Sequence, residues 1–463
     1  MELTKWSNQQ SIQTELWKEP QKKRKDMSSE ERVLLLQKKL YQKAKQEKEY
    51  RFYVLYDKVF LDYVIKESYR QVKQSGGGPG IDGVTFAEIE AQGVEAFLSE
   101  LREDLRTRRY KPGAVKRVWI PKANGGQRPL GIPIIRDRVA QMACKTVIEP
   151  IFEADFEDCS YGYRPERSAQ DAVREVKENL QRGKTTVYDA DLSKYFDTIP
   201  HEKLKKTLEV RISDPRILHL IKLWLKAPVI EDDKPRGGKN SEEGTPQGGV
   251  ISPLLANIYL NLLDKMVSNP EGLFARSGIR IVRYADDFVL MGRYISEEAT
   301  GRVSRLLERM ELKINQTKTK VVKVTEEPFD FLGFTIRYDR SIFDKRKRFW
   351  QIRPSEKSCK RLRHSINTKL KKIGHYAPEK VADEINRIVR GWLNYYHIDN
   401  VSYTQQARRE LSDYLRERLY RYYNRKSQRR TRLHGQQAFE MLVHEYGLIN
   451  PYKASGLVPH ANA

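Results

Sequence analysis

Hydrophobic positions recur along most of this chain at the helical spacing of three to four residues, which predicts a series of amphipathic helices. The first begins at Ser28-x-x-Glu31, a sequence typical of a capping box, and is expected to run to about Tyr53. Further helices are predicted over residues 60–73, 94–106, 137–151, 253–266, 296–311, 355–372 and 379–396, and another ends near Leu180. Glycine and proline interrupt the pattern at residues 76–83, which are therefore expected to form a loop.

Shorter runs rich in β-branched and aromatic residues predict strands. These runs cover residues 115–122 and 127–133 around the turn sequence Asn124-Gly125, residues 186–191, and residues 329–336. After the strand that ends at Asp191, the chain is expected to turn into a helix at about Leu192. Residues 329–336 are expected to close the sheet.

Residues 280–291 hold two apolar, strand-forming runs with Asp286 and Asp287 between them, a pattern that predicts a hairpin with adjacent carboxylates at its tip. Asp is common in turns for backbone reasons, so a solvated turn is the alternative interpretation. If the pair is functional, two neighbouring negative charges need a divalent cation, and oxygen ligands suit Mg²⁺. Asp191 is the candidate for a third ligand, and its alternative role is that of a helix N-cap.

Two other stretches have the chemistry to hold a triphosphate. Residues 243–257 pass from a Gly/Pro-rich turn into an apolar helix, which places Gln247 and bare glycine backbone at an anion-binding helix N-terminus. Lys122 and Arg128 flank the tip of the predicted hairpin around Asn124-Gly125. Basic hairpin tips are commonly just solvated, so this pair is ambiguous by itself.

The charge balance indicates a nucleic-acid partner. The chain has 463 residues, with 86 Lys and Arg against 62 Asp and Glu, a net charge of +24 and a pI near 9.6. This excess is far beyond what solubility needs and predicts binding to a polyanion. No run of about 18 apolar residues and no signal-peptide core occurs, so a soluble, intracellular protein of two or three domains is expected. The three cysteines are widely spaced, which excludes a disulfide framework and a Cys-rich zinc site.

Much of the positive charge lies toward the C-terminus. Residues 340–432 contain 26 Lys or Arg against 9 Asp or Glu, interleaved with tyrosines and tryptophans. Aromatic rings can stack on unpaired bases while arginines hold phosphates, a combination that suits structured RNA. The alternative for each aromatic residue is a place in the core.

Four motifs in this order make the chain resemble a reverse transcriptase: Asp191 to Asp197, Gly244-Thr-Pro-Gln-Gly-Gly249, Tyr284-Ala-Asp-Asp287 and Phe331-Leu-Gly-Phe334. More narrowly, the chain resembles the reverse transcriptase/maturases that group II introns encode. The motifs behind this second resemblance are Gly80-Ile-Asp-Gly83, Ile120-Pro-Lys122, Arg128-Pro-Leu-Gly-Ile-Pro133, Tyr161-Gly-Tyr-Arg-Pro165 and Gly391-Trp-Leu-Asn-Tyr-Tyr396.

The resemblance implies an α+β right-hand polymerase fold, with fingers, a palm built on an antiparallel sheet and a helical thumb, followed by a mainly helical maturase domain. The expected division is an N-terminal helical extension over residues 1–75, fingers and palm over 76–338, and thumb with the RNA-binding maturase domain over 339–463. Many members of the family carry a further Cys/His endonuclease. None is expected here, because nothing after Tyr446 supplies its ligands.

The same resemblance implies roles for particular residues. The catalytic ligands of two Mg²⁺ ions would be Asp191, Asp286 and Asp287. The dNTP would be bound by Lys122 and Arg128 at its triphosphate, by Gln247 and Lys318, and by Phe196, which would exclude a ribose 2′-hydroxyl. The primer end would be supported by Phe331, Leu332, Gly333 and Phe334, and RNA would be contacted by Trp392, Tyr395, Tyr396, Arg429 and Arg430.

The implied activity is RNA-directed DNA polymerisation, which is a nucleotidyl transfer. The protein would bind its host group II intron RNA, assist its splicing and reverse-transcribe it. Copying of this kind is the chemistry of retrohoming by a mobile genetic element. The protein's partners would be the intron RNA, a DNA primer or target and dNTPs, in the cytoplasm or nucleoid of a bacterium. No membrane partner is expected, and a homodimer is left open. Two alternatives also stay open: a non-catalytic RNA-binding splicing cofactor, and a reverse transcriptase recruited by its host for phage defence.

Overall fold

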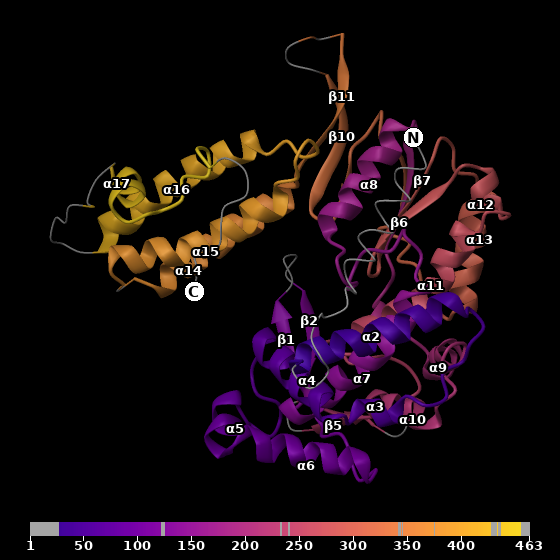
Figure 1. Ribbon diagram of the computed structural model, residues 1–463. Helices are drawn as coiled ribbons and strands as arrows, with labels where there is room; N and C mark the ends of the chain where they lie inside the picture. The colour runs from indigo at the N-terminus through magenta and orange to yellow at the C-terminus, as the bar shows by residue number, and fades with distance from the viewer. Residues whose placement is uncertain are drawn as a thin grey trace. The chain divides into compact units, whose positions relative to one another are not determined.

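The computed structural model describes residues 27–121, 126–231, 234–238, 241–340, 344, 346–374, 376–426, 433 and 437–454. They form two compact units, each of which mixes helices and strands (Figure 1). Unit 1 takes in the chain up to Ser168 together with Ala190–Val289 and Ser296–Thr319. Unit 2 takes in Ala169–Asp189, Leu290–Ile295 and the chain from Lys320 onward.

Unit 1 is built mainly from helices around the buried helix α7. The helices are α2 (Ser29–Gln46), α3 (Tyr56–Val59), α4 (Asp62–Ser75), α5 (Phe86–Gln92), α6 (Val94–Arg106), α7 (Ile135–Glu153), α9 (His201–Glu209), α10 (Pro215–Leu225), α11 (Ser252–Ser268), α12 (Leu273–Arg276) and α13 (Glu297–Arg309). A helix that is buried on all sides needs neighbours all round. The N-terminal helices α2, α3 and α4 cover α7 in this way (Figure 1).

Side-chain capping fixes the start of α2. Ser28 Oγ accepts the Glu31 N–H at 3.2 Å while the Glu31 carboxylate accepts the Ser28 N–H at 2.7 Å, so the predicted capping box is confirmed. The predicted continuation of this helix to Tyr53 is wrong. The chain has already left the helix there, because the Phe52 N–H donates to the Arg211 carbonyl at 2.7 Å instead of to a helical carbonyl.

The hairpin predicted ahead of α7 is confirmed. β1 (Val115–Pro121) and β2 (Gln127–Ile132) pair antiparallel, with Ile120 opposite Arg128, and the Asn124-Gly125 tip lies outside the described residues. β1 also pairs in parallel with β4 (Pro228–Glu231). β5 (Lys234–Gly237) completes a sheet of strand order β2-β1-β4-β5.

The predicted hairpin around the two aspartates is also confirmed, as β6 (Arg280–Tyr284) and β7 (Asp287–Gly292). Its sheet has the strand order β6-β7-β3-β8, in which β3 (Thr186–Ala190) pairs antiparallel with β8 (Lys320–Lys323). The helix predicted to begin at Leu192 is wrong. Leu192 bridges to Ile314, Lys194 takes the left-handed conformation with a φ of 50°, and a single 3₁₀ turn, η2 (Tyr195–Asp197), follows.

Unit 2 contains a second sheet, of strand order β11-β10-β9, formed by β9 (Phe329–Phe331), β10 (Phe334–Arg340) and β11 (Arg348–Pro354). The prediction that residues 329–336 form the strand that closes the central sheet is therefore wrong. Leu332 and Gly333 have φ values of 49° and 80°, so this run folds back on itself as a tight hairpin. The edge strands of the central sheet are β6 and β8.

The helices of unit 2 are α8 (Ala169–Gln181), α14 (Glu356–Lys372), α15 (Pro378–Tyr396), α16 (Gln405–Lys426) and α17 (Ala438–Glu445). α14 packs on α15, and α16 packs on α17 (Figure 1). No helix within the described ranges combines the length and the apolar character that crossing a bilayer would need. Cys144 is buried, and Cys159 and Cys359 are half-buried.

Candidate active site

The paired carboxylates lie where β6 leads into β7, with Asp286 in the turn and Asp287 as the first residue of β7. Ala285 takes the left-handed conformation with a φ of 57°, which costs a non-glycine residue about 1 kcal/mol and sets the direction of the two residues after it. Asp286 is half-buried and Asp287 is exposed. Burial raises the pKa of Asp286 above its ordinary value, and the nearby Asp191 charge adds to this, while Arg128 opposes it. Asp191 and Arg128 therefore lie close enough to Asp286 to change its pKa.

Asp191, the predicted third carboxylate, lies directly after β3 and is held by the segment that follows α13. Its Oδ2 accepts hydrogen bonds from Lys318 Nζ and Asn315 Nδ2, both at 3.0 Å. The Asn315 N–H also donates to the Asp191 carbonyl at 2.8 Å, and the Asp191 N–H donates to Thr319 Oγ1 at 3.3 Å. Lys318, predicted to bind the dNTP, is thus an ion-pair partner of Asp191 in this structure. The helix-cap alternative for Asp191 does not apply, because no helix begins there.

Two of the residues predicted to bind the dNTP meet in unit 1. Arg128 Nε donates to Gln247 Oε1 at 2.9 Å, and Gln247 Nε2 lies 3.5 Å from Asp197 Oδ2. The backbone brings them together, because the Gly131 N–H of β2 donates to the Gln247 carbonyl at 2.5 Å. Gly248 has a φ of 111° and no room for a side chain, since a Cβ there would lie 2.3 Å from the Gly131 carbonyl oxygen. Lys122 lies outside the described residues.

Phe196 lies in η2 and is only 5% exposed. Its ring meets that of Tyr195 edge-on at 5.6 Å, and its carbonyl accepts the Thr245 N–H at 2.7 Å. The hydrogen bond from Thr245 connects the turn after β3 with the loop that carries Gln247. The role of Phe196 in excluding a 2′-hydroxyl stays a prediction.

Tyr163 is a site residue to which the sequence assigned no role. It has a φ of 57° and is half exposed, and its ring centroid lies 6.5 Å from that of Tyr284. Burial is the main cause that raises the pKa of Tyr163, and the negative charge of Asp286 raises it further. The preceding residue, Gly162, packs so closely on the turn that a Cβ there would lie 2.4 Å from the Ala285 nitrogen. The motif around Tyr163 was visible in the sequence, but its contact with the aspartate turn was not.

The carboxylates of this site are suitable ligands for Mg²⁺ because they offer oxygen donors, not because they form a closed cage around a metal. No three His, Cys, Asp or Glu side chains among the described residues come close enough to surround a metal by themselves. Mg²⁺ usually binds through one or two carboxylates together with substrate phosphates and water, rather than in an all-protein cage. Asp286, Asp287 and Asp191 supply hard oxygen donors of the right kind, so the residues present fit a divalent cation that arrives with a nucleotide.

The residues predicted to support the primer form the hairpin between β9 and β10 in unit 2. Phe331 and Phe334 are buried, and the Leu332 carbonyl accepts a hydrogen bond from the Tyr395 hydroxyl at 3.0 Å. The Phe334 ring stacks on Tyr395 with centroids 5.8 Å apart and meets Tyr396 edge-on at 4.8 Å. Two of the aromatic side chains of α15 therefore pack on this hairpin.

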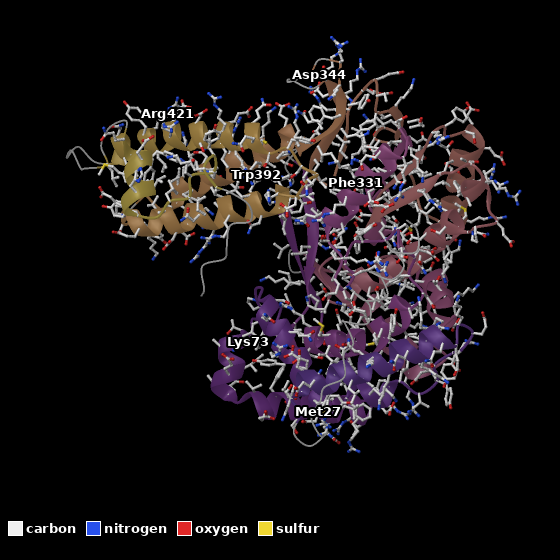
Figure 2. All side chains as sticks on the ribbon, turned by 45° about the horizontal axis from the view of Figure 1, so that its top comes forward. Met27, Lys73, Phe331, Asp344, Trp392 and Arg421 are labelled. Carbon is white, nitrogen blue, oxygen red and sulfur yellow. The ribbon has the colours of Figure 1, made fainter. Side chains whose placement is uncertain are left out.

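Trp392, also on α15 and labelled in Figure 2, is predicted to contact RNA. Its side chain is 9% exposed, and that of Tyr396 is 6% exposed. Their rings pack together with centroids 5.0 Å apart. Arg421 projects from the surface of α16 in the same unit (Figure 2). Arg429 and Arg430 lie outside the described residues. Contacts of these residues with RNA stay a prediction.

The comparisons with known proteins agree with this geometry. Residues 120–336 match the reverse transcriptase (RNA-dependent DNA polymerase) family, and residues 359–439 match the group II intron maturase-specific domain. Protein YkfC of Escherichia coli is 37% identical over 323 residues, which are 60% of this chain and 81% of that protein.

Two longer relatives match at lower identity. An uncharacterized 91 kDa protein in the cob intron of Schizosaccharomyces pombe is 26% identical over 77% of this chain and 53% of its own length. The group II intron-encoded protein LtrA of Lactococcus lactis is 28% identical over 53% of this chain and 51% of its own length. The chain thus spans about half the length of these two relatives.

The match over residues 120–336 identifies the class of this chain as a template-directed polymerase, and the aspartate-bearing hairpin is the candidate for its active site. The chain belongs to the reverse transcriptase family, in the group II intron-encoded branch that also carries a maturase domain. Members of the reverse transcriptase family use a divalent metal, which agrees with the oxygen donors found here.

Proposed function

We propose that this protein is an RNA-directed DNA polymerase that binds the RNA of a group II intron, assists its splicing and copies it into DNA. The observation that carries the proposal is the gathering, within unit 1, of the Asp286 and Asp287 turn, Asp191 and Arg128, with Gln247 bonded to Arg128. This arrangement combines a carboxylate centre with a group that suits a triphosphate. The fingers, palm and thumb of a right-hand polymerase, and the boundaries at residues 76 and 339, are part of the proposal.

In the proposed reaction the primer 3′-hydroxyl attacks the α-phosphate of a dNTP and pyrophosphate leaves. Asp191, Asp286 and Asp287 would hold two Mg²⁺ ions, which when bound supply the positive charge that neutralises the triphosphate and acidifies the primer hydroxyl. The protein itself contributes mainly position. The Arg128 guanidinium would hold phosphate oxygens, and the hydrogen bond from Arg128 keeps the Gln247 amide oriented beside the nucleotide. Phosphate would also offer Lys318 an alternative to its pairing with Asp191.

RNA binding is assigned mainly to residues 340–432, which contain 26 Lys or Arg and only 9 Asp or Glu. α14 shows the pattern most clearly, with one acidic residue in its first turn and Lys369, Lys371 and Lys372 in its last. Basic helices of this kind bind phosphates without reading sequence, so selection of one intron would need further contacts. The match of residues 359–439 to a maturase-specific domain supports an intron RNA as the partner.

A non-catalytic splicing cofactor is the alternative function. Such a protein would need the basic helices of unit 2 but would have no use for an acid such as Asp286 placed near both Asp191 and Arg128. The presence of Asp191, Asp286 and Asp287 in the positions described therefore favours the polymerase.

The test is the substitution Asp286→Asn, which preserves shape and removes one carboxylate charge. Extension of a DNA primer on an RNA template is expected to fall at least about 100-fold, because a metal ligand is lost. Affinity for intron RNA, measured by filter binding, is expected to change less than about twofold, because the turn holds no phosphate-binding cation. Asp57→Asn, at an exposed acid in α3, is the matched control and should extend normally. Unchanged extension by Asp286→Asn would overturn the assignment, and RNA binding without any extension by the unaltered protein would indicate the splicing cofactor.

A further inference from the structure

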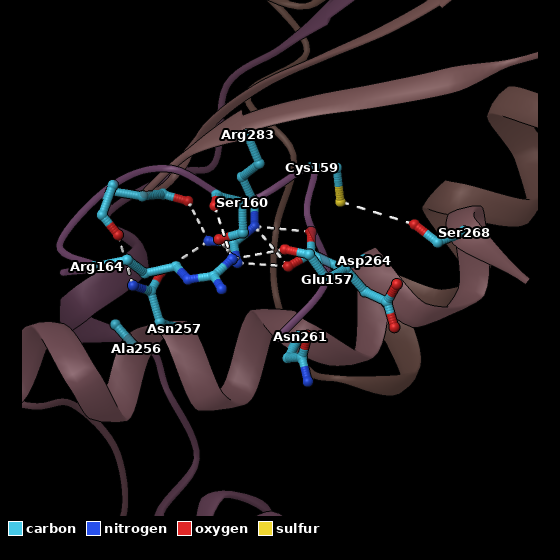
Figure 3. Close-up of polar contacts among 12 residues, drawn as sticks. Glu157, Cys159, Ser160, Arg164, Ala256, Asn257, Asn261, Asp264, Ser268 and Arg283 are labelled. Carbon is cyan, nitrogen blue, oxygen red and sulfur yellow. Dashed lines mark hydrogen bonds and ion pairs between the residues drawn. The ribbon is translucent and has the colours of Figure 1, made fainter. Parts of the chain in front are cut away.

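A buried guanidinium lies beneath the aspartate turn. Arg283, the residue before Tyr284 in β6, is 0% exposed, and so is its ion-pair partner Asp264 of α11 (Figure 3). The acceptors of its hydrogen bonds are both carboxylate oxygens of Asp264 at 2.8 and 3.0 Å from Nε, Asn257 Oδ1 and the Ala285 carbonyl at 2.9 Å each from Nη1, and Ser160 Oγ at 2.6 Å from Nη2. With a second bond from Nη2 to Asp264, the five N–H groups of Arg283 can all be used.

The bond to Ala285 connects this network with the catalytic turn. Ala285 is the residue whose left-handed conformation directs Asp286 and Asp287, and its carbonyl oxygen accepts a hydrogen bond from Arg283 Nη1. A buried carbonyl that lost its donor would have to rotate toward another one. The nitrogen of that peptide group belongs to Asp286, so its rotation would change the direction in which Asp286 points.

A second set of contacts holds the turn from its other side. Asn257, which accepts from Arg283, donates through Nδ2 to the Gly162 carbonyl at 2.7 Å. Gly162 in turn lies against the Ala285 nitrogen with no room for a side chain. The backbone of Arg283 is also fixed, since its N–H donates to the Cys159 carbonyl at 2.8 Å. Both peptide groups of Ala285 therefore rest on residues that Arg283 or Asn257 holds in place.

The chemistry of this pair indicates a purpose other than stability. Burying two charges is costly, and apolar residues of similar size often replace a buried ion pair without loss of stability. An apolar side chain at position 283 would leave the Ala285 and Asn257 oxygens without their donor. A lysine would keep the charge, but its three donors sit on one nitrogen and cannot reach Asp264 and Ala285 at once. Only a guanidinium serves all these acceptors together.

We propose that Arg283 is a positioning residue for the metal-binding turn, held in place by Asp264 and Asn257 of α11. It acts through Ala285 and touches neither substrate nor metal. The proposal rests on the proposed function, since it assigns Asp286 and Asp287 as metal ligands. It also connects α11, which follows the Gln247 loop, directly with the turn.

The experiment compares Arg283→Lys with the unaltered protein. Primer extension at saturating dNTP is expected to fall about 10- to 100-fold, because reacting groups lose their alignment, while KM for dNTP changes less than about threefold. Affinity for Mn²⁺, which stands in for Mg²⁺, is expected to fall about tenfold. It is measured by electron paramagnetic resonance on the complex with RNA template, a dideoxy-terminated primer and the matching dNTP, in which no bond can form.

Two further variants make the result specific. Arg211→Lys is the matched control, because Arg211 is another buried arginine bonded to backbone carbonyls, those of Ala44 and Glu47, and does not touch the turn. The double variant Arg283→Met with Asp264→Leu removes both charges together and should fold, yet it should lose extension and Mn²⁺ affinity like Arg283→Lys.

Extension rates and Mn²⁺ affinities in Arg283→Lys or the double variant equal to those of Arg211→Lys would overturn the positioning role. Absence of extension by the unaltered protein would instead contradict the proposed function. The Mn²⁺ affinities would still decide the role of Arg283 in that case.

Discussion

Asp137 of α7 is a buried acid whose ionisation the fold opposes. Its carboxylate accepts the Tyr110 hydroxyl at 2.6 Å and the Gly113 N–H at 2.7 Å, and Trp224 Nε1 donates to the Tyr110 oxygen at 2.9 Å. Burial nevertheless raises the pKa of Asp137 to about 6, because two hydrogen bonds do not replace the lost water. The group connects α7 and α10 with the segment that enters β1.

This pKa predicts a particular dependence of stability on pH. The folded protein holds the Asp137 proton up to a pH of about 6, whereas the unfolded chain releases it near 4, so the free energy of unfolding decreases as pH rises between these values. The loss attributable to Asp137 is expected to be up to about 3 kcal/mol, and it is complete above the folded pKa. Urea unfolding of the protein and of Asp137→Asn from pH 4 to 7 should show the decrease only where the acid is present. Parallel pH curves for the two proteins would contradict it.

Sequence reasoning predicted the acidic residues of the candidate site but did not predict the arginine beneath them. The three aspartates could be predicted because carboxylates at strand ends and turns suggest a metal. Arg283 could not, because its acceptors Asp264 and Ser160 lie 19 and 123 positions away along the chain. One local signal was available: Arg283 occupies the same face of β6 as Ile281, so a charge was aimed into the core.

At the scale of elements, the boundaries of helices could be predicted where one segment of the chain supplies both the donor and the acceptor of the hydrogen bonds that cap the end of the helix. The Ser28 and Glu31 capping box and the helix over residues 94–106 are found where the sequence placed them. Partners between distant segments were not predictable. The run 329–336 was predicted as one strand, whereas the structure divides it into β9 and the start of β10 with a tight turn at Leu332 and Gly333, and the pairing of β10 with β11 depends on residues outside the run.

The loop that carries Gln247 offers a prediction at this scale. Gly248→Ala adds a methyl group that would meet the Gly131 carbonyl of β2, so the loop must move away and break the contact between Gln247 and Arg128. KM for dNTP in primer extension is expected to rise at least about tenfold, and stability to fall by about 1 to 3 kcal/mol.

The matched control separates backbone strain from this contact. Gly278 also has a positive φ, 65°, but nothing lies within 4 Å of an added Cβ. Gly278→Ala should therefore cost about 1 kcal/mol of stability without any change in KM for dNTP. Equal KM values for the two variants would show that the packing of the loop on β2 does not position the nucleotide.

At the scale of the whole molecule, charge is the property that sequence reasoning describes most directly, because it needs no knowledge of contacts. The net charge of +24 is concentrated in residues 340–432. The structure adds which of these charges are available. In α14, Lys360 and Lys369 pair with Glu356 and Glu384, whereas Lys371 and Lys372 are exposed at the helix end. The exposed pair is the better candidate for phosphate contacts.

Substitution of this pair tests whether unit 2 carries the RNA affinity. Phosphate contacts release counterions, so each one lost lowers the dependence of log K on log salt by about one. Lys371→Gln with Lys372→Gln is expected to weaken intron RNA binding and reduce the salt slope by about one to two. Lys206→Gln with Lys222→Gln removes the same charge from exposed positions in α9 and α10 of unit 1, and should leave the slope unchanged. Filter binding between 50 and 300 mM salt, about the range in which such slopes are measured, gives both values. A slope that falls equally in both variants would mean that RNA responds to net charge alone, and that unit 2 is not its specific binding surface.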